Sequence, residues 1–118
     1  MYNRDRLLGK FIQNYHFERA KSSFFVTKRG FIQYSIRGNT VYIEEFYLDH
    51  EYRMGKSVFD FANSFIEFCK RIYCNEIIGY VELEYPNGHL IEKLFKMYGM
   101  TKDEYQYSDH HIRYRKQI

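Results

Sequence analysis

The hydrophobic positions along the chain follow a helical period at its beginning and again in its middle. Between Arg4 and about Ala20 the apolar side chains recur three or four positions apart, which predicts a first helix. These side chains are Leu7, Leu8, Phe11, Ile12, Tyr15 and Phe17. A wider stripe of the same period follows Ser57, which stands where a helix N-cap belongs, and predicts a second helix. Its members are Val58, Phe61, Ala62, Phe65, Phe68 or Ile66, Cys69, Ile72 and Tyr73.

Segments rich in β-branched and aromatic residues alternate with these helices and predict strands. Three lie between the two helices, at 24–27, 31–36 and 40–48, and the Gly-containing turns between them indicate antiparallel pairing. The remaining elements are a strand at 76–83, a short helix at 90–98 and a terminal antiparallel pair at about 101–107 and 110–116. The order α-β-β-β-α-β-α-β-β predicts a right-handed parallel crossover between the third and fourth strands. We therefore expect an α/β fold with a mixed sheet and helices on both faces.

Length and composition limit the architecture further. With 118 residues, of which 45% are hydrophobic and 28% charged, we expect one domain over residues 1–118 rather than a disordered or fibrous chain. The apolar runs are too short to span a membrane and the polar N-terminus lacks a signal-peptide pattern, so we expect a cytoplasmic protein. Cys69 and Cys74 have no further Cys or His partners at ligand spacing. We therefore expect no metal site and no disulfide, and a buried thiol at Cys69, which falls on the apolar stripe of the second helix.

The charge distribution gives little support for a nucleic-acid or membrane partner. Lys and Arg total 18 against 15 Asp and Glu, a net charge of +3, and the basic residues stand in short clusters among acidic ones. Most of the 13 Tyr and 11 Phe fall on strand or helix periods, so we interpret them as core residues. A nucleic-acid binder using Tyr side chains with Arg113, Arg115 and Lys116 would show steep salt dependence. The aromatic surplus is also compatible with a homodimer.

Residues 49–58, between the third strand and the second helix, form the first candidate site. A helix N-terminus entered from a strand presents unpaired N–H groups and a positive dipole end, which suit a phosphate group. Arg53 and Lys56 add positive charge, Gly55 permits close backbone approach and Ser57 adds a hydroxyl. A P-loop is excluded because His50 stands where that motif requires its first Gly. An ordinary strand-to-helix turn with surface charges is the alternative.

The segment from Val41 to Val58, with the amphipathic helix after it, resembles the acetyl-CoA-binding core of the GNAT superfamily of N-acyltransferases. Members commonly run strand, V-x-P-x-Y-R, Gly-containing turn and helix. The residues in that register here are Leu48, His50, Tyr52 and Arg53. The distal segment Leu94-Phe-Lys-Met-Tyr-Gly-Met also resembles the family's l-Y-e-k-x-G-F at the end of its last helix. The resemblance covers nearly the whole chain, with the family's first strand missing or shortened.

This resemblance implies that acetyl-CoA is the co-substrate and that its pyrophosphate and pantetheine arm contact the turn. The implied contacts are Leu48, Arg53, Met54, Gly55, Lys56, Ser57 and Val58. The family pattern R/Q-x-x-G-x-G/A is altered here. Started at Arg53, it places Lys56 and Val58 at its two small-residue positions. Started one residue earlier, Gly55 and Ser57 fit, but Tyr52 takes the Arg/Gln place.

The family's general base is often a carboxylate on the strand before the turn, which accepts a proton from the amine directly or through water. Glu44 shares strand parity with Tyr42, the position nearest that role, and is therefore the candidate base. Strict alternation would point Glu45 to the other face, and solvent-facing roles for both are the alternative. Where many members carry a Tyr that protonates the leaving thiolate, this chain has Phe95, and Tyr98 lies three positions further on.

Two functions follow from the resemblance. The first is an N-acetyltransferase that moves an acetyl group from acetyl-CoA to an amine, on a protein or a small molecule, by direct attack. The alternative is a GNAT-fold protein without catalysis, acting as a binding or inhibitory module on a protein partner, which the altered Gly pattern and Phe95 favour. The short N-terminus and Tyr/Asn-rich composition also resemble those of small phage-encoded proteins.

Overall fold

The computed structural model describes residues 4–20, 22–82, 88–103 and 111–118. Its helices are α1 (Arg4–Ala20), the 3-10 helix η1 (His50–Tyr52), α2 (Lys56–Arg71) and α3 (Gly88–Met97). Its strands are β1 (Ser23–Thr27), β2 (Gly30–Arg37), β3 (Thr40–Leu48), β4 (Glu76–Glu82), β5 (Thr101–Lys102) and β6 (His111–Gln117). The predicted order of helices and strands is confirmed. For the terminal pair, residues 104–107 and 110 of the predicted strands lie outside the described residues.

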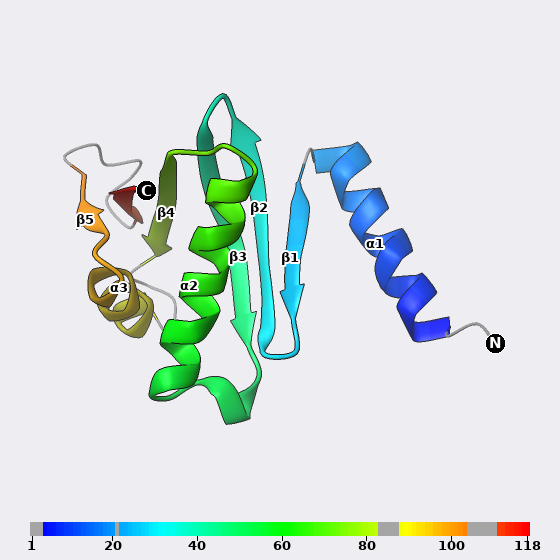
Figure 1. The fold of residues 1–118 in the computed structure, drawn as a ribbon, viewed down its shortest axis with the longest axis horizontal. Helices are drawn as coiled ribbons and strands as arrows, with labels where there is room; N and C mark the ends of the chain where they lie inside the picture. The colour runs from blue at the N-terminus through cyan, green and yellow to red at the C-terminus, as the bar shows by residue number, and fades with distance from the viewer. Residues whose placement is uncertain (1–3, 21, 83–87, 104–110) are drawn as a thin grey trace.

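The strands form one mixed sheet in the order β1-β2-β3-β4-β6-β5. The β3–β4 pair is parallel, as predicted, and α2 connects these two strands. Their pairing runs only from Thr40 opposite Glu76 to Ile43 opposite Gly79, and the strands then separate. Figure 1 shows them diverging toward the end of the sheet at which α2 begins. We call this divergence the β3–β4 opening.

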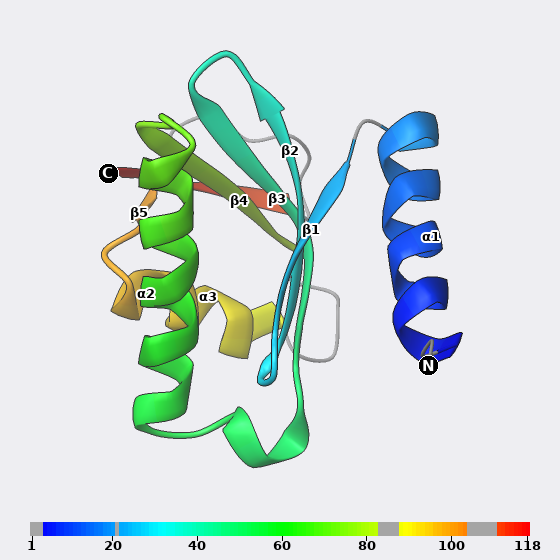
Figure 2. The same ribbon diagram turned by 45° about the vertical axis from the view of Figure 1, so that its right-hand side comes forward.

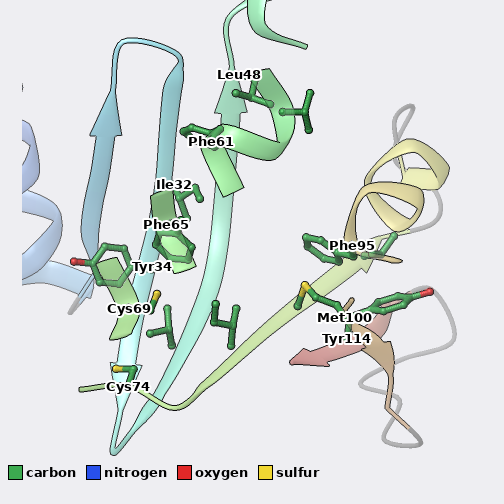
Figure 3. Packing of buried hydrophobic residues seen from close by; sticks show 14 residues of the cluster. Ile32, Tyr34, Leu48, Phe61, Phe65, Cys69, Cys74, Phe95, Met100 and Tyr114 are labelled. Atoms are coloured by element: carbon green, nitrogen blue, oxygen red, sulfur yellow. The ribbon is translucent and has the colours of Figure 1, made fainter. Parts of the chain in front are cut away.

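The core lies on the face of the sheet that α2 and α3 cover, which we call the inner face (Figure 2). Apolar side chains of α2 point into it and meet those of the central strands, as Figure 3 shows for Phe61 and Phe65 near Ile32. Cys69 and Cys74 are free thiols, and both are buried, which was predicted for Cys69. Desolvation raises the pKa of Cys69 to about 12, with a smaller contribution from neighbouring Cys74, whose own pKa burial also raises.

The alternation predicted along β3 is broken at Glu44. Tyr34 of β2 pairs with Ile43 and Gln33 pairs with Glu45, so Glu44 is an extra residue in a β-bulge. Directly opposite residues share a face, and Gln33 lies between inward-facing neighbours. Glu45 therefore lies on the outer face, which α2 and α3 leave uncovered. The prediction that Glu45 points away from the face of Tyr42 is wrong, because one inserted residue reverses the side-chain pattern.

The start of α2 also differs from the prediction. The N-cap residue is Gly55, not Ser57, and no described side chain caps this end of the helix. Gly55 has φ 67° and ψ −141°, a backbone conformation that is readily accessible only to glycine. This conformation turns the chain from η1 into α2. The first turn of the helix is thus left with main-chain N–H groups and no side-chain acceptor of its own.

The helix α1 forms over the predicted residues, but its apolar side chains do not join the core. Figure 2 shows it on the outer side of the sheet, standing away from the strands. Leu7, the least exposed of its six apolar side chains, is 37% exposed and Phe11, the most exposed, is 60%. The predicted helices on both faces therefore correspond to two packed helices on the inner face and one helix on the other side whose apolar side chains are largely exposed. No described helix is long and apolar enough to span a membrane.

Candidate functional site

A cavity of about 270 Å³ lies in the β3–β4 opening. The bulge residues Glu44 and Glu45 contribute to one wall, and β4 and β6 contribute Tyr80, Glu82 and His111 to the other. The apolar part of the lining consists of Ile43, Phe46, Ile91 and Phe95. Three acidic side chains and no Lys or Arg stand among the described residues that line it. A cavity of this charge attracts cations and disfavours anions.

The two adjacent glutamates differ in their surroundings. Glu44 Oε2 accepts a hydrogen bond of 2.5 Å from the hydroxyl of Ser22, a fully buried residue that precedes β1. This bond reaches across β2 and orients one oxygen of the carboxylate. Oε1 of Glu44 and both oxygens of Glu45 have no hydrogen-bond partner among the described residues. Ser22 gives no signal in the sequence, because only the folded sheet brings it to Glu44.

The wall formed by β4 and β6 carries the third carboxylate of the cavity, that of Glu82. His111 pairs with Glu82 directly across the β4–β6 ladder, and its Nε2 lies 3.8 Å from Glu82 Oε2. A protonated imidazole at this position would partly neutralise Glu82. The two carboxylates of the bulge have no basic partner of this kind among the described residues, so the negative charge of the cavity is concentrated on its β3 side.

A second, apolar cavity of about 60 Å³ adjoins the first on the inner face. Phe46 and Phe95 line both cavities, so the two adjoin at these rings. Its described lining also includes Leu48 at the end of β3, Val58 in the first turn of α2, and Tyr98 after α3. A narrow apolar path thus lies between the end of α2 that carries the free N–H groups and the acidic cavity.

The predicted cofactor-binding residues gather at the end of β3 and the start of α2. Leu48 is buried, while Met54 is 85% exposed. Arg53 does not extend toward the α2 N-terminus: its Nε donates to the Leu48 carbonyl at 2.8 Å, and its guanidinium carbon lies 5.5 Å from the centroid of the Tyr47 ring. Lys56 is exposed in the first turn of α2, next to Ser57. Of the two predicted cations, Arg53 and Lys56, it is therefore Lys56 that lies on α2 itself.

Phe95, at the family's acid position, packs on the main chain of Gly79, which has no side chain. A Cβ placed on Gly79 would lie 2.8 Å from Cζ of Phe95, so the para carbon of the ring faces the Gly79 main chain. Figure 3 shows Phe95 close to Met100 and Tyr114 in the core. The ring carries no acidic proton, and its para position is enclosed on the side of Gly79.

The Tyr98 hydroxyl is engaged elsewhere. It donates a hydrogen bond of 2.5 Å to the main-chain carbonyl of Val58, which connects the end of α3 to the first turn of α2. Burial raises the pKa of Tyr98 to about 12, which keeps the phenol neutral near pH 7. Tyr98 therefore acts in the structure as a link between two helices.

Comparison with known proteins identifies the fold. No family model matches the chain, and no curated protein sequence matches it. Among solved structures, PaiA N-acetyltransferase from Thermoplasma acidophilum in complex with coenzyme A is 16% identical with a TM-score of 0.69, covering 100% of this chain and 81% of that chain.

Two further solved structures are similar. The N-acetyltransferase PseH from Campylobacter jejuni, in complex with acetyl coenzyme A, is 15% identical with a TM-score of 0.67, covering 92% of this chain and 75% of that one. A ribosomal-protein-alanine N-acetyltransferase from Brucella melitensis is 13% identical with a TM-score of 0.65, covering 95% and 78%. The chain therefore has the α/β fold of the GNAT N-acyltransferases.

Proposed function

We propose that this protein is an N-acetyltransferase that moves an acetyl group from acetyl-CoA to an amine acceptor. The observation that carries the proposal is the β3–β4 opening, in which an acidic cavity adjoins an apolar path leading to a helix N-terminus. The similar structures with coenzyme A or acetyl coenzyme A bound share this fold and support an acyl-CoA as the donor. No step of the proposed reaction requires a metal ion.

The residues of the turn fit the donor. The phosphates would bind the main-chain N–H groups of Gly55, Lys56 and Ser57, with the helix dipole and the Lys56 ammonium adding attraction. Leu48 and Val58 would flank the apolar arm, and the exposed Met54 would cover it. Arg53 would act from the end of β3, where it binds the Leu48 carbonyl and adds positive charge to this side.

The acidic cavity suits the acceptor, because an amine is a cation before it reacts. Glu44 would accept a proton from the ammonium group through Oε1, directly or through a water molecule, while Ser22 holds Oε2. The freed amine nitrogen then attacks the thioester carbonyl carbon: a C–N bond forms, the C–S bond breaks, the electron pair leaves on sulfur, and the nitrogen releases its second proton to solvent to give the amide. Neither Phe95 nor Tyr98 is placed to protonate the thiolate, so its proton comes from solvent.

The second candidate function is a GNAT-fold binding module without catalysis. It is favoured by Phe95, which has no proton to donate, and by Tyr98, whose hydroxyl is bound to Val58. The two candidates differ in what happens after acetyl-CoA binds. An enzyme releases free thiol when a suitable amine is present, whereas a binding module retains or ignores the donor.

Calorimetric titration with acetyl-CoA, followed by a thiol-release assay against a panel of amines, tests the proposal. We expect Lys56→Glu to weaken acetyl-CoA binding at least about tenfold. Lys70→Glu is the matched control, because it makes the same charge change in the last turn of the same helix, about 21 Å away. Absence of binding to the folded wild-type protein would contradict both the donor and the enzyme.

Binding without thiol release from any amine would instead favour the binding module. In an active protein, Glu44→Gln should lower turnover by about a hundredfold or more while leaving acetyl-CoA affinity unchanged, as loss of a general base predicts. Glu45→Gln is its control on the adjacent position. An equal loss in both variants would contradict the assignment of the base to Glu44.

A further inference from the structure

The side chains of α1 form an apolar stripe that lies outside the core. Leu7, Phe11 and Tyr15 are spaced four residues apart, and Leu8 and Ile12 stand beside them, so the five share one side of the helix. Their exposed fractions lie between 37% and 60%. The projecting helix also enlarges the molecule: the radius of gyration is 14.8 Å, against about 13.5 Å expected for a compact chain of this length.

The outer face of the sheet carries an apolar row that could accept such a helix. Val26, Phe31 and Tyr47 stand directly opposite one another on three successive strands. Val26 is 59% exposed and Tyr47 is 43% exposed. The Phe31 ring packs between those of Phe24 and Tyr47, at centroid distances of 5.7 Å and 6.0 Å. The row is therefore a packed, partly exposed apolar surface on three neighbouring strands, which we call the outer aromatic row.

The connection between α1 and β1 is two residues long and ends on an anchored residue. Only residues 21 and 22 separate the end of α1 from β1, and Ser22 is fully buried and bonded to Glu44. To lie on its own outer aromatic row, α1 would have to pivot about this anchor. A second copy of the chain has no such restriction, and short connections of this kind favour exchange of an element between copies.

The exposed area is sufficient for a stable dimer. The five apolar side chains of the stripe, each about half exposed, offer roughly 400 Å² on each helix if a full side chain presents about 150 Å². Covering one helix would bury about 800 Å² counting both surfaces, and a symmetric pair contains two such contacts, about 1,600 Å² in all. Stable interfaces bury about 1,200–2,000 Å² in total, so the pair falls within that range.

We propose that two copies of this chain form a symmetric dimer in which the apolar stripe of each α1 packs on the outer aromatic row of the other copy. Each chain carries both complementary surfaces, as a two-fold interface requires. The proposal does not depend on acetyl-CoA binding, so it stands or fails separately from the proposed function.

Sedimentation equilibrium of the full chain over a concentration series tests the dimer. We expect the wild-type protein to sediment at twice its mass of 14.6 kDa. Phe11→Glu in the stripe and Val26→Glu in the outer aromatic row should each weaken association at least about tenfold, because each places a charge in an apolar contact. Gln13→Glu adds the same charge on the opposite side of α1 and should leave association unchanged. Circular dichroism establishes that each variant is folded.

Three results would overturn the proposal. A wild-type protein that stays monomeric at hundreds of micromolar would mean that α1 closes on its own sheet or stays uncovered. A dimer weakened by Phe11→Glu but not by Val26→Glu would mean that the two helices pair with each other instead. A dimer that survives Phe11→Glu would mean that α1 takes no part in the interface.

Discussion

The Tyr98 hydroxyl and the Val58 carbonyl form a hydrogen bond of 2.5 Å that joins the end of α3 to the first turn of α2. The two residues are forty positions apart and both line the apolar cavity. The bond fixes the relative position of the two helices that cover the inner face. It also engages the hydroxyl of Tyr98, the phenol three positions after Phe95, whose proton is donated to a main-chain carbonyl.

Tyr98→Phe should lower the free energy of unfolding by about 1 kcal/mol at pH 8, since the Val58 carbonyl loses its donor. Burial raises the pKa of Tyr98 to about 12, so the folded state favours the neutral phenol. The stability linked to this shift is fully present below about pH 10, the unfolded value, and is lost as the pH rises toward 12. Urea unfolding of both proteins at pH 8 and pH 11 measures the difference.

The difference between wild type and Tyr98→Phe should therefore shrink at pH 11, and growth of that difference would contradict the assignment. Comparing the two proteins at each pH cancels the titration of Tyr34 and Tyr114, whose pKa values burial also raises. Turnover of Tyr98→Phe should stay within about tenfold of wild type. A loss of a hundredfold or more would identify Tyr98 as a general acid.

Gly55→Ala should cost about 1–3 kcal/mol of stability, because a side chain is strained at φ 67° and ψ −141°. It should also weaken acetyl-CoA binding by disturbing the first turn of α2. Gly38→Ala is the control: Gly38 also has a positive φ, 62°, in the β2–β3 turn, so the substitution should destabilise the protein too, with no effect on binding. Calorimetric titration of both variants would reject the site if they bound acetyl-CoA equally well.

Gly79→Ala should destabilise the protein by about 1–3 kcal/mol, because the new methyl group would lie 2.8–2.9 Å from two atoms of the Phe95 ring. The smaller side chain in Phe95→Leu should relieve that clash. In a double-mutant cycle by chemical denaturation, Gly79→Ala should therefore cost less in the Phe95→Leu background than in wild type. Strict additivity would mean that the ring and the backbone do not constrain each other.

Ser22→Ala should reduce turnover by about tenfold without changing acetyl-CoA affinity, since Glu44 would lose the hydrogen bond that orients it. In the Glu44→Gln background the same substitution should have little further effect on turnover. Steady-state kinetics of the two single variants and the double variant measure this coupling. An undiminished effect of Ser22→Ala in Glu44→Gln would show that Ser22 acts on something other than this carboxylate.

The elements with strong periodic patterns were predictable from the sequence. The bounds of β3 agree with the prediction, and so do the presence of the long amphipathic helix α2 and the parallel crossover between β3 and β4. These features depend on local composition and on side-chain periodicity, which one sequence contains. The turn predicted at 49–58 was placed correctly only in part: the connection spans 49–55 and contains η1, and α2 already begins at Lys56.

The features that depend on spatial neighbours were not predictable. The bulge at Glu44 arises from the pairing of β3 with β2, and it reverses the face on which Glu45 lies. Gly55 caps α2 through its backbone conformation, which a preference for hydroxyl caps does not reveal. The stripe of α1 has the spacing of a buried face, yet its side chains stay exposed, because α1 stands away from the strands (Figure 2).

The two buried cysteines have a practical consequence. At neutral pH a thiol with a pKa of about 12, such as that of Cys69, contains almost no reactive thiolate, and burial keeps reagents away from both sulfur atoms. Native protein should therefore resist alkylation, and coenzyme A thiol could be counted against a silent background. Because Cys69 lies on α2 and Cys74 lies two residues before β4, their labelling rate in dilute denaturant would report how often this helix leaves the sheet.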